Sequence, residues 1–347
     1  MKKICNKIIF FALFASITVY FSNVFAQETL RERFKEKIKE IIQEKDKQKT
    51  EKSYDTADPE FSLMHDDLIR KYKVHLPAGY DREKSYPVVI YVHGGGGDMR
   101  AAYMDNVDKA ADKFGFILAI PEGTGEVKLG RLRGTWNGGS WAEGSCCGNA
   151  DDIGFISKMI DELKIKFNVD AKRIYATGIS NGGLMTNRIG CELSEKVAAI
   201  AVVAPAAVES ACHPSRPMPV MDIQGTADPL NPPDGSEPKG IFAKDSGSPL
   251  GMPYKRMTCY QVVDTWKNID KCSSQETVTY ENGKAKCISC NDCADGAEVV
   301  LCIVKGMGHT YPGGAQYLPA KIVGPVSNDI SFDQIWEFFK KHSLDSK

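Results

Sequence analysis

The sequence predicts an α/β fold in which a mostly parallel central sheet carries helices on both faces. Short apolar runs of strand length alternate with helix-like segments from about residue 60 onwards. This alternation is typical of parallel sheets, because each crossover between parallel strands needs a long connection that is usually a helix. Residues 123–150 and 229–296 break the alternation, and both are rich in glycine and cysteine. The 347 residues suit one large α/β domain or two small ones.

The first 26 residues have the pattern of a secretory signal peptide. The chain begins Met-Lys-Lys, residues 8–21 are almost wholly apolar, and Ala26 closes a small-x-small ending. The apolar run is shorter than the roughly 20 residues of a membrane span, which favours a cleaved signal over an uncleaved anchor. We therefore expect a secreted or periplasmic protein that is not inserted in a membrane after cleavage.

Residues 27–58 are predicted to be a charged linker or helix that precedes the domain. Residues 28–52 are dense in Glu, Lys, Arg and Gln, with too few apolar side chains to build a core. We expect one catalytic domain over residues 59–347. We do not expect the protein to bind nucleic acid, which would require an excess of positive charge, because 44 Lys and Arg nearly balance 45 Asp and Glu over the chain. The sequence does not indicate an oligomeric state.

The predicted elements follow from apolar runs, β-branched content and helix start signals. Strands are expected at 68–76, 87–92, 116–120, 173–177, 197–203, 219–223 and 297–304, and helices at 102–114, 151–167, 181–192, 257–268 and 332–341. Both irregular segments follow predicted strands. They should therefore lie at the carboxyl edge of the sheet, where α/β folds bind ligands.

Ser180 is the candidate nucleophile. It lies in Gly178-Ile179-Ser180-Asn181-Gly182, between a predicted strand and a predicted helix. A sharp strand-to-helix turn exposes a serine hydroxyl, and flanking glycines tolerate the strained backbone and its close neighbours. The motif alone is common by chance, but this context favours catalysis over a structural turn.

His309 is the candidate base and Asp228 the candidate carboxylate that orients it. Each follows a predicted strand, and the chain order Ser180, Asp228, His309 differs from the two other common triad orders. Asp222 and Asp234 remain weaker alternatives for the acid. The other histidines lie in less suitable contexts, at positions 65, 75, 93, 213 and 342.

His93-Gly94-Gly95-Gly96-Gly97 directly follows a predicted strand. Its exposed amides can form half of an oxyanion hole, with donors from Gly95 and Gly96, while the Asn181 amide forms the other half. A phosphate-binding loop is the alternative, but neither the Lys-Ser/Thr ending nor the dinucleotide pattern follows. We expect the His93 side chain to hold the loop by a hydrogen bond.

Ten cysteines remain after the predicted signal removes Cys5 from the 11 in the chain. An even number in an exported protein favours disulfides. The run Cys287-x-x-Cys290-x-x-Cys293 could instead hold zinc, but it has neither a second separated pair nor a nearby histidine. We expect disulfides of unknown connectivity and no metal.

A set of motifs occurs in one order along residues 65–340 and resembles a known family. The motifs are His93-Gly94-Gly95-Gly96, Thr135-Trp136-Asn137, Cys146-Cys147-Gly148, Asp151-Asp152-Ile153-Gly154-Phe155, Gly178-Ile179-Ser180-Asn181-Gly182-Gly183, Gly225-Thr226-Ala227-Asp228-Pro229 and Gly308-His309-Thr310-Tyr311-Pro312-Gly313-Gly314. Together they are similar to the polyhydroxybutyrate depolymerases and the feruloyl and acetylxylan esterases of carbohydrate esterase family one.

The resemblance implies an α/β-hydrolase fold and no metal or organic cofactor, while the cysteine-rich loop insertions are expected from this sequence itself. It implies ester hydrolysis through an acyl-enzyme, with Ser180, Asp228 and His309 as the triad. It also suggests that Trp136 borders the acyl pocket, although loop packing explains this residue equally well, and His93 is the second candidate for substrate binding. Expected substrates are small or polymer-linked esters, namely feruloyl or acetyl esters of plant polysaccharide or short hydroxyalkanoate esters. An exopeptidase or thioesterase on the same fold, and a catalytically silent binding protein, are the alternatives.

Overall fold

The computed structural model describes residues 58–128, 131–139, 150–205, 207, 212–238 and 256–344. Its main element is a ten-stranded sheet. The strands are β1 (Glu60–His65), β2 (Leu68–His75), β3 (Tyr86–Val92), β4 (Ile117–Pro121), β7 (Val169–Ile179), β8 (Ala199–Val203), β9 (Val220–Gly225), β10 (Thr277–Asn282), β11 (Ala285–Cys290) and β12 (Val299–Val304). Their spatial order is β1-β2-β4-β3-β7-β8-β9-β12-β11-β10.

The centre of the sheet is parallel, which confirms the predicted fold class. β4, β3, β7, β8, β9 and β12 pair in parallel. Antiparallel strands extend both edges, β1 and β2 beside β4, and β11 and β10 beside β12. All central strands therefore end at one edge of the sheet, and the loops that follow them gather there.

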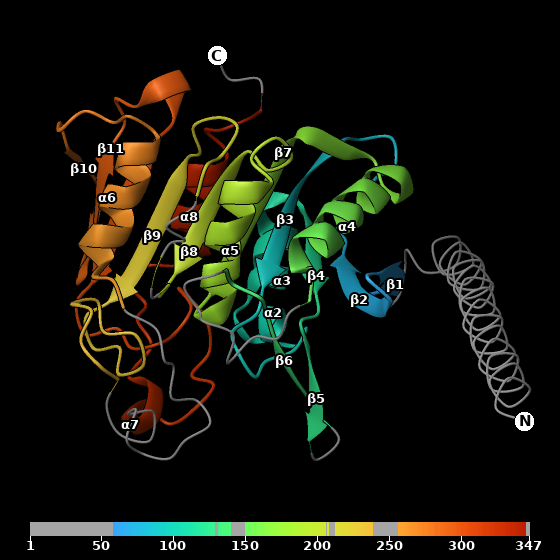
Figure 1. Ribbon diagram of the computed structural model, residues 1–347, viewed down its shortest axis with the longest axis horizontal. Coiled ribbons are helices and arrows are strands. Elements are labelled where there is room, and N and C mark those ends of the chain that lie inside the picture. The colour runs from blue at the N-terminus through green and yellow to red at the C-terminus, as the bar shows by residue number, and fades with distance from the viewer. Residues whose placement is uncertain are drawn as a thin grey trace, which may run out of the picture.

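Helices cover both faces of the sheet (Figure 1). They are α2 (Ala101–Met104), α3 (Val107–Phe114), α4 (Asp152–Lys166), α5 (Asn181–Glu192), α6 (Cys259–Ile269), α7 (Ala320–Val323) and α8 (Phe332–Phe339). α4, α5 and α6 lie on one face, and α3 and α8 contact each other on the opposite face. The predicted helix 102–114 is divided into α2 and α3, because Asn106 adopts a left-handed conformation and its side chain donates to the Gly313 carbonyl.

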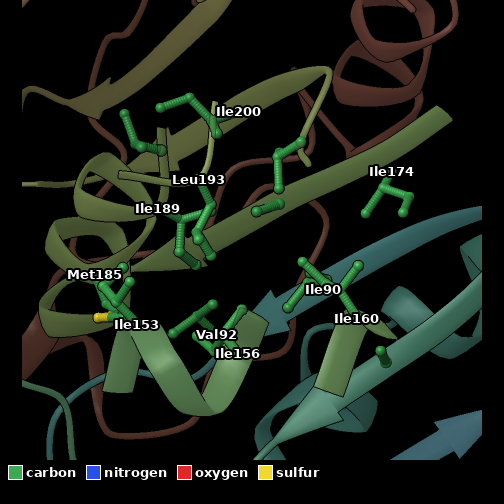
Figure 2. Packing of buried hydrophobic residues seen from close by; sticks show 14 of the residues in the cluster. Ile90, Val92, Ile153, Ile156, Ile160, Ile174, Met185, Ile189, Leu193 and Ile200 are labelled. Atoms are coloured by element: carbon green, nitrogen blue, oxygen red, sulfur yellow. The ribbon is translucent and has the colours of Figure 1, made fainter. Parts of the chain in front are cut away.

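Two hydrophobic cores fill the spaces between the sheet and its helices. Side chains alternate along β3, so Ile90 and Val92 join one core while Val89 and Tyr91 join the other. Figure 2 shows the first core, where isoleucines of α4 pack beside Ile90 and Val92. Burying each such side chain contributes roughly 1.5–3 kcal/mol, so the central strands form a stable base for the loops at their carboxyl ends.

The two segments predicted to be irregular contain regular hairpins. β5 (Thr124–Lys128) and β6 (Arg131–Thr135) form a separate antiparallel pair within residues 123–150. β10 and β11 form another within residues 229–296 and extend the main sheet. The sequence indicated only the helix at 257–268 in these segments, and the hairpins were missed because their strands are short and none is a continuous apolar run.

The disulfides Cys191–Cys212, Cys272–Cys293 and Cys287–Cys302 are present. This confirms the expectation of disulfides and gives three pairings that the sequence could not. Cys259 and Cys290 are buried free thiols, and the sulfur of Cys290 lies within 4.8 Å of both sulfurs of the Cys272–Cys293 pair. Since Cys287 bonds to Cys302, the three cysteines of the Cys-x-x-Cys-x-x-Cys run do not form one zinc site. Cys146 and Cys147 lie outside the described residues.

Within the described ranges, no helix has both the length and the apolar character needed to cross a bilayer. The predicted signal peptide and the charged segment up to residue 57 lie outside those ranges, as do residues 140–149 and 239–255 of the two insertions.

Candidate active site

Ser180 occupies the turn between β7 and α5. Its backbone has φ 60° and ψ −122°, a conformation that non-glycine residues adopt only at a cost. A Cβ at Gly178 would lie 2.6 Å from the carbonyl oxygen of Val92, and a Cβ at Gly182 would overlap the same oxygen. The two glycines therefore allow β3 to approach the turn, and Ser180 stands at the carboxyl edge of the sheet.

His309 and Asp228 contact each other at this edge. Asp228 follows β9 and His309 follows β12, which is the parallel neighbour of β9. His309 Nδ1 lies 2.6 Å from Asp228 Oδ2, and both side chains are buried. Asp228 Oδ1 accepts hydrogen bonds from the amides of Leu230 and Asn231, each at 2.8 Å. Asp228 thus orients the imidazole with Nδ1 as the donor, which leaves Nε2 for proton transfer.

Of the three carboxylates considered from the sequence, Asp228 is the one that contacts His309 in the described part of the chain. Asp222 is fully buried inside β9, where its Oδ1 accepts from the Gln224 side chain and burial raises its pKa well above the usual range. Asp234 accepts from the Ser236 amide farther along the loop. The geometry therefore favours Asp228 as the partner of the base.

The loops of Ser180 and Asp228 are both attached to the end of β8. The Ser180 amide donates to the Val203 carbonyl at 2.9 Å, and the Asn231 side chain donates to the Ala204 carbonyl at 2.9 Å. Within the described residues, no hydrogen bond joins the Ser180 hydroxyl to His309. Such contacts are often long in unliganded hydrolases and shorten when substrate binds.

The glycine loop after β3 lies against the first residue of α5. A Cβ at Gly95 would lie 3.4 Å from the Cβ of Asn181. The Gly96 amide donates to the Gly134 carbonyl at 2.7 Å, so this N–H is already used. The Gly95 amide has no acceptor in the described part of the chain. We therefore correct the donors expected from the sequence: Gly96 is removed, and Gly95 stays with the Asn181 amide.

Trp136 and His93 do not face a substrate. Both are fully buried, and Trp136 belongs to the hydrophobic core. The indole Nε1 of Trp136 donates to the His93 carbonyl at 2.9 Å. His93 Nδ1 lies 2.9 Å from the Gly94 carbonyl, and Nε2 accepts from the Gly123 amide at 3.0 Å. Their assignment to substrate binding was therefore wrong, because both side chains pack behind the glycine loop, whereas the predicted loop-holding role of His93 agrees with its contacts.

The buried position of His93 makes a prediction about its protonation. Burial, opposed by the Gly94 carbonyl, lowers the pKa of His93 from 6.5 to about 4. Because this pKa lies below that of an unfolded imidazole, the residue stabilises the fold above about pH 6.5, and that contribution is lost as the pH falls towards 4. In two-bond ¹H–¹⁵N spectra at about pH 5.5, where an unperturbed imidazole is largely protonated, we expect the His93 signals of a neutral ring with the proton on Nδ1. A cationic ring at that pH in folded protein would contradict the assigned hydrogen bonds.

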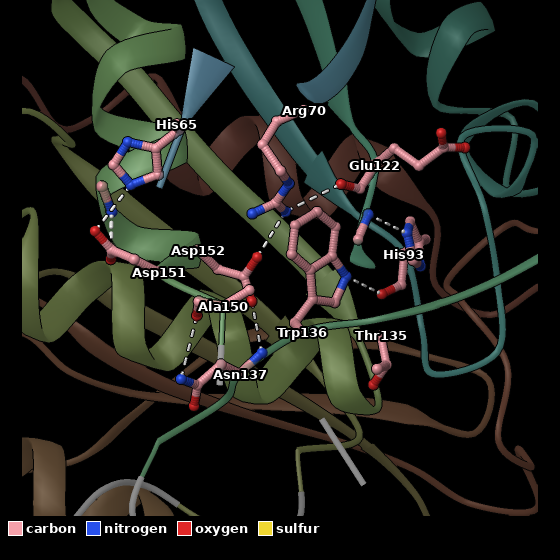
Figure 3. Close-up of polar contacts among 12 residues, drawn as sticks. His65, Arg70, His93, Glu122, Thr135, Trp136, Asn137, Ala150, Asp151 and Asp152 are labelled. Carbon is pink, nitrogen blue, oxygen red and sulfur yellow. Dashed lines mark hydrogen bonds and ion pairs between the residues drawn. The ribbon is translucent and has the colours of Figure 1, made fainter. Parts of the chain in front are cut away.

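A buried ion pair behind Trp136 was not recognised from the sequence. Arg70 Nη2 donates to Asp152 Oδ1 at 2.6 Å and to the Glu122 carbonyl at 3.2 Å, and Asp152 Oδ2 accepts from the Asn137 amide at 2.7 Å (Figure 3). The exposed fractions of Arg70 and Asp152 are 3% and 0%. The sequence indicated Asp152 only as part of the motif Asp151-Asp152-Ile153-Gly154-Phe155. Its partner lies 82 residues earlier, and no local pattern predicts that pairing.

Sequence comparisons find relatives whose names describe esterases. Feruloyl esterase B of Piromyces equi is 30% identical over 256 residues, which are 71% of this chain and 43% of that protein. A Nocardia uniformis protein whose name assigns it to the esterases (NocK) is 29% identical over 277 residues, 76% of each chain. No protein-family model matches. The chain thus spans less than half the length of the Piromyces enzyme.

Solved structures show the same fold. The acetyl xylan esterase from Aspergillus awamori aligns with a TM-score of 0.53 at 14% identity, over 81% of this chain and 99% of that one. At this identity the likeness concerns the fold, an α/β sheet with helices on both faces. The chain is thus similar in sequence to feruloyl esterases and similar in fold to a solved acetyl xylan esterase.

Proposed function

We propose that this protein is a serine esterase that hydrolyses carboxylic esters through an acyl-enzyme. The observation that carries the proposal is the contact between His309 and Asp228 at the edge where Ser180 stands in a strained turn. Strained backbone is expensive and persists mainly where function requires it. The sequence relatives support the same reaction class, since their names describe esterases.

The proposed reaction has two halves. His309 Nε2 takes the proton of the Ser180 hydroxyl as its oxygen attacks the ester carbonyl, and Asp228 stabilises the imidazolium that forms. The amides of Gly95 and Asn181 donate to the oxyanion of the tetrahedral intermediate. His309 then protonates the leaving alcohol. In the second half it activates water, which attacks the acyl-enzyme and releases the carboxylic acid and Ser180.

We propose feruloyl or acetyl esters of plant polysaccharide as the substrates, with short hydroxyalkanoate esters as the second choice. The relatives include a feruloyl esterase and a bifunctional acetylxylan esterase/xylanase of Neocallimastix patriciarum, which is 26% identical over 156 residues. We further propose that residues 1–26 are removed on export and that residues 59–347 form the catalytic domain in the periplasm or outside the cell. The disulfides support export, because they persist in oxidising compartments.

A labelling and substrate experiment tests this function. Folded protein is treated with a fluorophosphonate probe and the modified residue is identified by mass spectrometry, with heat-denatured protein as the control. The same preparation is assayed on methyl ferulate, acetylated xylan, p-nitrophenyl acetate, hydroxybutyrate oligomers, a thioester and an aminoacyl p-nitroanilide. We expect labelling of Ser180 and turnover of the oxygen esters.

The outcomes separate the alternatives. Faster turnover of the anilide or the thioester would identify a peptidase or thioesterase on the same fold. Labelling on another serine would exclude Ser180 as the nucleophile. Absence of labelling together with absence of turnover, in protein that unfolds cooperatively, would favour a binding protein and overturn the proposal.

A further inference from the structure

The two oxyanion donors of the proposed site belong to different segments. Gly95 lies in the loop after β3, and Asn181 begins α5 after β7. Oxyanion stabilisation requires both N–H groups at hydrogen-bond distance from one oxygen, and errors of about 1 Å in such sites cost around 10²-fold in rate. β3 and β7 are paired directly as far as Val92 and Gly178, but Gly95 and Asn181 lie beyond that pairing, so a further contact is needed to fix the separation of the two donors.

Residues 134–137, here called the bridging segment, contact both sides. On one side, the Asn181 carboxamide makes three hydrogen bonds to it. Asn181 Oδ1 accepts from the Trp136 amide at 2.8 Å and from the Thr135 hydroxyl at 3.0 Å, and Nδ2 donates to the Trp136 carbonyl at 3.1 Å. Only 2% of Asn181 is exposed. The side chain that follows the proposed nucleophile thus binds the bridging segment through both its oxygen and its nitrogen.

On the other side, the bridging segment holds the glycine loop. Gly134 accepts from the Gly96 amide at 2.7 Å and donates to the Gly97 carbonyl at 2.9 Å. The indole of Trp136 donates to the carbonyl of His93, two residues before Gly95. The loop is therefore fixed by backbone contacts after Gly95 and by the indole contact before it.

The bridging segment is in turn held from α4. The Asn137 amide donates to Asp152, which pairs with Arg70 (Figure 3). Trp136 is fully buried, so its indole has no alternative partner in solvent. The bridging segment therefore has contacts to α5, to the glycine loop and to α4, and it cannot shift towards one without losing a buried hydrogen bond to another.

We infer that Trp136 and the side chain of Asn181 are positioning residues that set the distance between the Gly95 and Asn181 amides. This inference rests on the proposed function, and neither side chain touches the substrate in it. Loss of the indole N–H leaves the His93 carbonyl without this donor and weakens the attachment of the first half of the glycine loop. The rate of the chemical step then falls while ground-state binding of the ester is preserved, since the donors act on charge that develops in the transition state.

The test compares Trp136→Phe with Trp266→Phe. Trp266 is the matched control, because it is fully buried in the same core and its Nε1 donates to Asn187 at 3.0 Å. We expect Trp136→Phe to lower kcat by about 10- to 100-fold, somewhat less than removal of a whole donor, with KM within about twofold. The Ki of a trifluoromethyl ketone analogue, which forms an oxyanion on serine, should rise by a similar factor. Trp266→Phe should lower Tm comparably and leave kcat and Ki unchanged.

A second pair of variants, with smaller changes, keeps the test valid if Trp136→Phe folds poorly. Thr135→Val removes the hydroxyl contact with Asn181, and Thr265→Val removes a hydroxyl contact to the Gln261 carbonyl in α6. We expect a several-fold fall in kcat for Thr135→Val alone. The inference would be overturned if Trp136→Phe and Thr135→Val both had the same kcat as the wild type. A rise in KM without a change in kcat would also overturn it, because that result would place Trp136 against the substrate.

A readout independent of turnover separates this inference from the proposed function. In protein labelled with ¹⁵N-glycine and ¹⁵N-asparagine, the amide signals of Gly95 and Asn181 should move in Trp136→Phe and remain in place in Trp266→Phe. Wild-type protein without ester turnover would overturn the proposed function, while the spectra would still decide whether Trp136 sets the donor positions. Unmoved signals would reject the inference even in an active enzyme.

Discussion

Replacing Ser180 with alanine is expected to lower kcat for ester hydrolysis by about 10⁴- to 10⁶-fold, the loss seen when a triad residue is removed from a known serine hydrolase. The reason is the loss of the attacking oxygen, for which water in the same site is a poor substitute. The fold should survive, because alanine at this position would pay the same cost for the strained backbone as serine does. In the described residues the serine hydroxyl also has no hydrogen bond to His309 that the change would remove. Initial rates on the best ester of the panel measure the effect.

Two companion variants sharpen this result. His309→Ala should cost about as much as Ser180→Ala, and the double variant should cost little more, because residues that act as one unit are not additive. Asp228→Asn should cost less than either, since the imidazole remains but loses its orienting charge. If Ser180→Ala retained more than about 1% of wild-type kcat in purified protein, another residue would be the nucleophile.

Replacing Asp152 with alanine is expected to lower the free energy of unfolding by about 3–5 kcal/mol. The change leaves the guanidinium of Arg70 buried and without its charge partner, and it removes the acceptor of the Asn137 amide. Breaking a buried ion pair from one side costs far more than the pair itself contributes, because the remaining charge has no hydration. Guanidinium chloride unfolding, with the m-value checked, measures the loss.

The matched control lies on the same helix. Asp161 of α4 forms an ion pair with Lys196 at 2.7 Å, but its side chain is 55% exposed. Asp161→Ala should therefore cost less than about 1 kcal/mol. Similar losses for the two aspartates would show that the Arg70–Asp152 pair is hydrated in solution, contrary to the structure.

The sequence predicted the central fold and the three main site residues because both depend on local patterns. Buried parallel strands are continuous apolar runs, and each candidate residue follows one of them. The Ser180 turn can also be predicted from neighbouring residues, since Gly178 and Gly182 lie where the backbone of β3 approaches. Such signals need no knowledge of distant contacts.

The remaining features depend on contacts between distant residues. The family resemblance suggested Trp136 as a pocket residue, with loop packing as an equal alternative, and the indole donates to a carbonyl 43 residues earlier. From the sequence alone, the Gly96 amide was expected to be available as an oxyanion donor. The structure shows that it donates to the carbonyl of Gly134, which is distant in sequence. The two hairpins were missed because their strands are short and none is a continuous apolar run.

The five-residue motif around Ser180 combines two kinds of requirement, with different consequences for descendants of this chain. Gly178 and Gly182 are required by the fold, because a Cβ at either would press on the backbone of β3. Ser180 is required only by the proposed chemistry, and its strained backbone costs on the order of 1–3 kcal/mol. A descendant that had lost catalysis would keep both glycines while the serine drifted to residues that relax the turn. Under the proposed function, the serine in that costly conformation is therefore needed for turnover and not for the fold.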